Sequence, residues 1–136
     1  EALAALETKS ACVVIHADLR ETQNWEYPRD FRAYRRWPNY TLSAWDYLRK
    51  NRLSPDLILI DGRFRVACLL ASLLEAKPGT DILFDDYEDR RKFYASVEKI
   101  IAPASMIDRS AIFTVPETFN RPAVARGLAR FINIPD

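Results

Sequence analysis

Three short apolar runs constrain the fold of this chain most strongly. They cover residues 12–15, 57–60 and 82–84, and each is followed by a polar residue. Uninterrupted apolar runs of this length are typical of parallel strands that are covered on both faces. Between them lie stretches with apolar residues at helical spacing, most clearly residues 64–76. The alternation predicts an α/β fold with a doubly wound, Rossmann-like and mostly parallel sheet.

The C-terminal part departs from this alternation. Two short strands are predicted at residues 105–107 and 111–115, and the three residues between them are too few for a crossover. We therefore expect an antiparallel hairpin there. A last helix is predicted from Pro122, a favourable first residue, to about Phe131. The whole chain, residues 1–136, is interpreted as a single α/β domain with one core.

The composition narrows the class of protein. Hydrophobic residues make up 49% of the chain and charged residues 29%, which is the balance of a globular domain. The net charge of +1 creates no overall field that would attract nucleic acid or an anionic membrane. The longest largely apolar run, residues 66–74, falls far short of the roughly 20 residues that a membrane span needs. We expect a cytoplasmic protein that acts on a small-molecule substrate and has no nucleic acid or membrane partner; a homodimer is one expected state.

The first residues suggest an incomplete start. The sequence begins at Glu1 without an initiator Met, and residues 1–7 resemble the end of a helix. We interpret the domain as N-terminally incomplete, lacking its first strands. Cys12 and Cys68 both lie among apolar neighbours and are predicted to be buried thiols, with a disulfide as the alternative.

Acidic residues follow two of the predicted strands. Asp61 comes after residues 57–60, and Asp85 and Asp86 come after residues 82–84. Ligands of open α/β sheets bind beyond the carboxyl ends of the strands, so we expect these three carboxylates at one rim. Such carboxylates repel one another unless they are solvated, protonated, paired with arginine or bound to a cation such as Mg²⁺. All three are candidate metal ligands, and Asp61 and Asp85 are candidate catalytic residues. Helix capping explains Asp86 equally well.

Basic and aromatic side chains flank these acids. Arg63 and Arg65 follow Asp61 and could clamp an anionic group of a substrate, with Tyr87 as a further substrate contact. Alternatively, the two arginines pair with the acids and hold the rim together.

An irregular stretch over residues 22–40 is rich in aromatic residues and arginine, as binding loops often are. Trp25 could line a pocket there, although ordinary packing is the alternative. Asp18, at the end of the first predicted strand, could accept a hydrogen bond from an adenine amino group. The interleaved arginines could contact RNA, but the balanced net charge argues against it.

Two segments carry a family resemblance: PDLILIDGRFRVACLL at residues 55–70 and ILFDDYEDRRKFY at residues 82–94. Together with a Trp-x-x-Pro element at residues 25–28, they resemble a methyltransferase-like group of uncharacterised bacterial proteins with IDGRFR and FDDY segments. Residues 55–115 look like the later half of a class I S-adenosylmethionine-dependent methyltransferase. The resemblance implies that residues 12–15 form the third strand of that fold and that the hairpin forms the sixth and seventh strands.

The resemblance also implies a site. Asp18 and Trp25 would contact the S-adenosylmethionine cofactor, and the glycine-rich loop and second-strand acid of the family would precede this chain. Asp61, Asp85 and Asp86 match the places at which metal-dependent O-methyltransferases hold Mg²⁺. The implied function is Mg²⁺-assisted methyl transfer to a small polar or anionic acceptor. The alternatives are a non-catalytic methyltransferase-like binding or assembly module and a metal-dependent nucleotide-sugar transferase.

Overall fold

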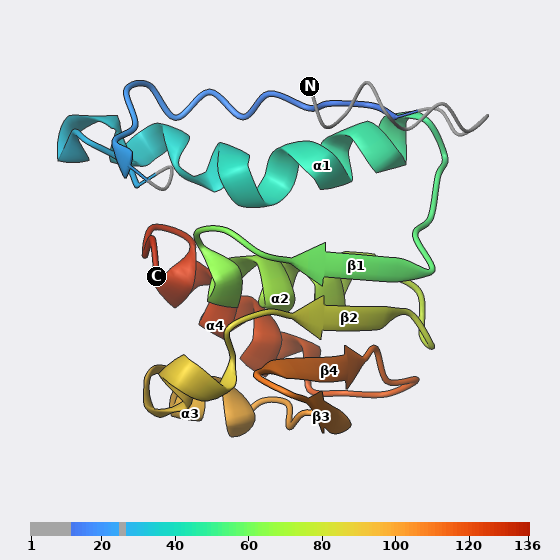
Figure 1. Cartoon of the computed structure of the whole chain (residues 1–136). Helices are drawn as coiled ribbons and strands as arrows, with labels where there is room; N and C mark the ends of the chain where they lie inside the picture. Colours follow the sequence, from blue (N-terminus) through green and yellow to red (C-terminus); the bar gives the residue numbers. More distant parts are fainter. Residues whose placement is uncertain (1–11, 25–26) are drawn as a thin grey trace.

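A computed structural model describes residues 12–24 and 27–136 as helices around a small sheet (Figure 1). The elements, in which η marks a 3-10 helix, are in chain order η3 Phe31–Arg36, α1 Pro38–Lys50, β1 Leu57–Ile60, α2 Arg65–Glu75, β2 Asp81–Phe84, η4 Glu88–Arg90, α3 Arg91–Glu98, β3 Ser105–Ile107, β4 Ser110–Thr114 and α4 Arg121–Phe131.

The sheet has four strands in the order β1-β2-β4-β3. β1 and β2 are parallel, whereas β4 is antiparallel to both β2 and β3. The predicted C-terminal hairpin is therefore confirmed. The prediction of a mostly parallel, doubly wound sheet is wrong, because two of the three strand pairings are antiparallel. In the described sheet, α2 makes the one helical crossover between parallel neighbours.

The expected strand at residues 12–15 accounts for much of this difference. The segment does not form a strand, and Val13, Val14 and Ile15 are exposed. Figure 1 shows it away from the sheet, beyond α1. An apolar segment becomes a strand only where a neighbouring strand supplies hydrogen-bond partners, and the described residues provide none beside it. Cys12 is consequently exposed rather than buried, while Cys68 on α2 is half-buried, and both are free thiols.

The core lies between the sheet and two helices. α2 and α4 pack together behind the sheet in Figure 1, and Leu70 of α2 contacts the face of α4 at Gly127. The apolar face of α2 is buried throughout, as its helical spacing predicts. An aromatic cluster of Phe84, Tyr87 and Tyr94 belongs to the same core and extends it toward α3.

Helix boundaries follow local signals. α2 begins after Phe64, whose φ of 54° is left-handed and ends the preceding loop. α4 begins with Arg121-Pro122, and the side chain of Asn120 accepts a hydrogen bond from the backbone N–H of Ala123. Within the described part of the chain, every helix is too short or too polar to cross a membrane.

Candidate active site

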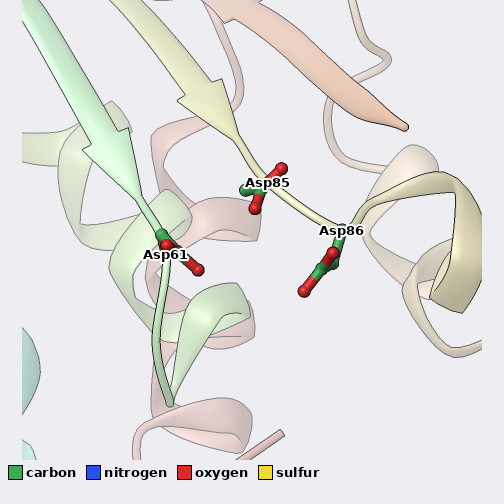
Figure 2. Close-up of side chains that lie close together, drawn as sticks. All are labelled: Asp61, Asp85 and Asp86. Carbon is green, nitrogen blue, oxygen red and sulfur yellow. The ribbon is translucent and has the colours of Figure 1, made fainter. Parts of the chain in front are cut away.

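Three carboxylates meet where β1 and β2 end. The strands pair in parallel register, with Ile60 opposite Phe84, so the residues that follow leave the sheet side by side. Figure 2 shows Asp61 on the loop after β1, and Asp85 and Asp86 on the loop after β2. One oxygen from each carboxylate lies within 4.8 Å of the others. Asp61, Asp85 and Asp86 thus form the expected acidic rim.

A buried guanidinium underlies the acidic rim. Arg65, the first residue of α2, is only 4% exposed. Its Nε donates to the carbonyl of Gly62 at 2.9 Å, and its Nη1 donates to the carbonyl of Asp85 at 2.9 Å. Its Nη2 lies 3.2 Å from Oδ2 of Asp86 and 3.6 Å from Oδ1 of Asp61. Arg65 therefore joins the loops that follow both strands, as the arginine-pairing interpretation predicted.

A second guanidinium reaches the rim from the terminal hairpin. Arg109 lies in the turn between β3 and β4, with Nη2 3.3 Å from Oδ2 of Asp85 and Nη1 3.0 Å from Oδ1 of Asp86. Ser110 donates its hydroxyl to Oδ1 of Asp85 at 2.8 Å. This hydrogen bond, together with a backbone N–H and the nearby arginines, lowers the pKa of Asp85 below its usual value.

Sequence reasoning missed Arg109 and Ser110. β4 runs antiparallel beside β2 with Ala111 opposite Phe84, which brings the start of β4 next to the acids that follow β2. The signal was present in the hairpin prediction, because a strand that returns alongside β2 must begin near the end of β2. The pairing of β4 with β2, rather than with β1, could not be read from the sequence.

Helix capping does not explain Asp86. The N-cap residues of η4 and α3 are Tyr87 and Arg90, and neither helix has a side-chain cap. Asp86 instead has a left-handed backbone with φ of 54° and directs its carboxylate toward Arg65 and Arg109.

The acidic rim has the donor chemistry of a Mg²⁺ site. Three carboxylate oxygens at this separation suit a hard cation, and water could complete its shell because the Asp61 side chain is 57% exposed. The arginines already compensate much of the charge. Arg65 is fixed by its buried hydrogen bonds, whereas the Arg109 side chain is 55% exposed and free to withdraw into solvent. The three carboxylates therefore have the donor chemistry for Mg²⁺, while Arg65 and Arg109 are their partners in this structure.

Arg63 and Tyr87, the other two predicted substrate contacts, interact with other parts of the chain. Arg63 is half-buried; its Nη1 donates to the backbone carbonyl of Asp136 at 3.3 Å, and its guanidinium lies 5.9 Å from the ring centre of Tyr27. Tyr87 is fully buried, and its hydroxyl donates to Glu98 at 2.8 Å, so it packs in the core rather than facing a substrate. Burial also raises the pKa of Tyr87.

Asp18, one of the two expected cofactor contacts, makes other interactions. Asp18 is exposed, and its carboxylate accepts a hydrogen bond from the backbone N–H of Arg20 and pairs with the guanidinium of Arg36. The hydrogen bond from Arg20 is the main reason why the pKa of Asp18 is lowered. Trp25 lies outside the described residues.

The rim opens into a polar pocket of about 950 Å³. Its lining comprises the three aspartates, four arginines including Arg65 and Arg109, and the neutral residues Thr22, Gln23 and Gly62. A pocket lined by both carboxylates and guanidiniums suits a small polar molecule that carries an anionic group as well as hydrogen-bond donors.

Comparison with known proteins identifies the fold. No protein-family model and no curated protein matches the chain. Among solved structures, a methyltransferase-like protein from Silicibacter pomeroyi DSS-3 is similar, with a TM-score of 0.73 and 33% sequence identity. The match covers 86% of this chain and 59% of that protein, so the chain spans less than two thirds of its neighbour's length. The likeness confirms the methyltransferase-like expectation, and the chain has a methyltransferase-like α/β fold.

Proposed function

We propose that this chain forms the acceptor side of an S-adenosylmethionine-dependent methyltransferase that acts on a small polar or anionic acceptor. The proposal rests on the convergence of Asp61, Asp85 and Asp86 at one rim of a methyltransferase-like fold. Parallel strand ends are the usual ligand edge of such sheets, and the adjoining pocket contains both charges. We also propose that the chain belongs to the methyltransferase-like group with IDGRFR and FDDY segments.

The two candidate catalytic residues have different electrostatic environments. Asp85 stays ionised because Ser110 and the arginines lower its pKa, so it is a weak base and a good electrostatic partner. Asp61 makes one long ion pair, at 3.6 Å to Arg65, and its side chain is largely open to the pocket. We therefore assign to Asp61 the role of holding the acceptor hydroxyl and receiving its proton.

S-adenosylmethionine would supply an electrophilic methyl group, and Mg²⁺ at Asp61, Asp85 and Asp86 would lower the pKa of the acceptor hydroxyl. The arginines of the pocket would orient an anionic group on the acceptor. Arg65 keeps the two acidic loops at a fixed separation through its buried hydrogen bonds.

Calorimetric titration of the complete protein with S-adenosylmethionine tests this proposal, with and without Mg²⁺. We expect saturable binding, followed by transfer of labelled methyl groups to a member of a panel of hydroxylated carboxylates and phosphates. Asp61→Asn should abolish transfer while leaving cofactor binding intact. Asp46→Asn is the matched control, because Asp46 lies exposed on α1, away from the acidic rim, and pairs with Arg49. Absence of cofactor binding under both conditions would refute the proposal.

One observation favours a second function, that of a non-catalytic methyltransferase-like binding or assembly module. Arg65 and Arg109 pair with all three rim carboxylates, as a purely structural network would require. Methyl transfer that is lost in Asp61→Asn would exclude this alternative.

A further inference from the structure

Another pocket lies outside the acidic rim, and its lining has a larger excess of arginines over acids. It has a volume of about 530 Å³ and is lined by Arg20, Arg32, Arg35 and Arg36 together with two acids, Glu21 and Asp30. We name it the arginine pocket. Four guanidiniums around one open pocket repel one another, so their proximity requires an explanation.

Local pairs account for only part of that charge. Arg36 is neutralised by Asp18, while Glu21 is already engaged by Arg29, which lies outside the lining. The Asp30 carboxylate accepts the backbone N–H of Arg32 at 2.8 Å, where it caps η3. Within residues 12–24 and 27–136, the side chains of Arg20, Arg32 and Arg35 have no ion-pair partner.

The backbone directs these three arginines into the same space. Arg20 has a left-handed backbone with φ of 68°, which turns the chain just after Asp18. Arg32 and Arg35 are three residues apart on η3, and residues at that spacing on a 3-10 helix lie above one another. Arg35 is also oriented by its neighbour, because its Nε donates to the Tyr34 hydroxyl at 3.3 Å.

We propose that the arginine pocket binds the phosphate group of a small phosphate monoester. Guanidinium groups bind phosphate through paired N–H donors, and a dianion matches a pocket in which unpaired positive charge exceeds negative charge. None of the lining residues belongs to the acidic rim, so phosphate binding can be measured separately from methyl transfer. Failure of the phosphate-binding proposal would therefore leave the proposed methyl transfer unaffected.

The test is calorimetric titration of the complete protein at constant ionic strength, in separate experiments with inorganic phosphate and with adenosine monophosphate. We expect saturable binding of both that weakens by at least about tenfold in the double variant Arg32→Gln/Arg35→Gln. Arg126→Gln/Arg130→Gln is the matched control: it removes the same charge from exposed positions of α4 and should bind as the wild type does. All the substituted side chains are exposed, so thermal melting should show intact folding in both variants.

Equal weakening in the two double variants would overturn the proposal, since it would indicate a general charge effect. A lack of saturable binding by the wild type would overturn it as well. Single-stranded oligonucleotides form a further arm. Affinity that rises with each added nucleotide beyond that of the monophosphate would reassign the pocket to a nucleic acid backbone and refute the small-ligand proposal.

Discussion

Replacement of Arg65 by Met tests whether the buried guanidinium holds the acidic rim together. Met keeps most of the apolar volume but removes hydrogen bonds to the carbonyls of Gly62 and Asp85 and to the Asp86 carboxylate. Breaking a buried charged pair by removing one partner typically costs about 3–5 kcal/mol. The more exposed contact with Asp61, at 3.6 Å, should add less than about 1 kcal/mol. We therefore expect Arg65→Met to lower the free energy of unfolding by about 3–5 kcal/mol.

Urea denaturation at pH 7, monitored by tryptophan fluorescence, measures this change because Trp37 and Trp45 are buried. Arg91→Gln is the control: its side chain is 50% exposed, and its solvent-screened pairs with Glu88 and Glu98 should contribute little to stability. If the free energy of unfolding of Arg65→Met lies within about 1 kcal/mol of the wild-type value, relaxation or water replaces the lost hydrogen bonds. That result would refute the role assigned to Arg65.

Three further predictions concern the surroundings of the site. A Cβ at position 62 would overlap the Tyr40 hydroxyl, so Gly62→Ala should destabilise by about 1–3 kcal/mol. Tyr40→Phe should remove the steric part of that penalty, because the next atom is a ring carbon at 3.5 Å. Additive effects in a urea double-mutant cycle would contradict this. Burial raises the pKa of Cys68 to about 12, so iodoacetamide at pH 8 should modify the exposed Cys12 and spare Cys68, as peptide mass mapping would show. Arg109→Ala should tighten Mg²⁺ binding by about tenfold, as judged by calorimetry, since two competing ion pairs are lost; unchanged affinity would mean that Arg109 does not compete.

Much of the fold could be predicted because its signals are local. The apolar runs at residues 57–60 and 82–84 became β1 and β2, and the short spacing before residue 111 gave the antiparallel hairpin. The convergence of Asp61 with Asp85 also followed from the sequence, since two parallel strands end at the same edge of a sheet.

Other features depended on which elements become neighbours. Residues 12–15 have the composition of a buried strand but remain exposed, because strand formation requires a partner that composition cannot specify. Tyr87 follows the acid pair in sequence, yet its side chain turns into the aromatic core beside Phe84. Adjacent residues on a turn can point in opposite directions, and the direction is decided by packing.

The sequence alone predicts that three carboxylates gather where two parallel strands end. The side chains around these carboxylates depend on contacts between distant parts of the chain. Arg109 and Ser110 are more than twenty residues from Asp85 along the chain, and they reach it because β4 returns beside β2. Long-range pairing thus sets the charge around the rim and lowers the pKa of Asp85, since electrostatic interactions depend on distance in space rather than on separation in sequence.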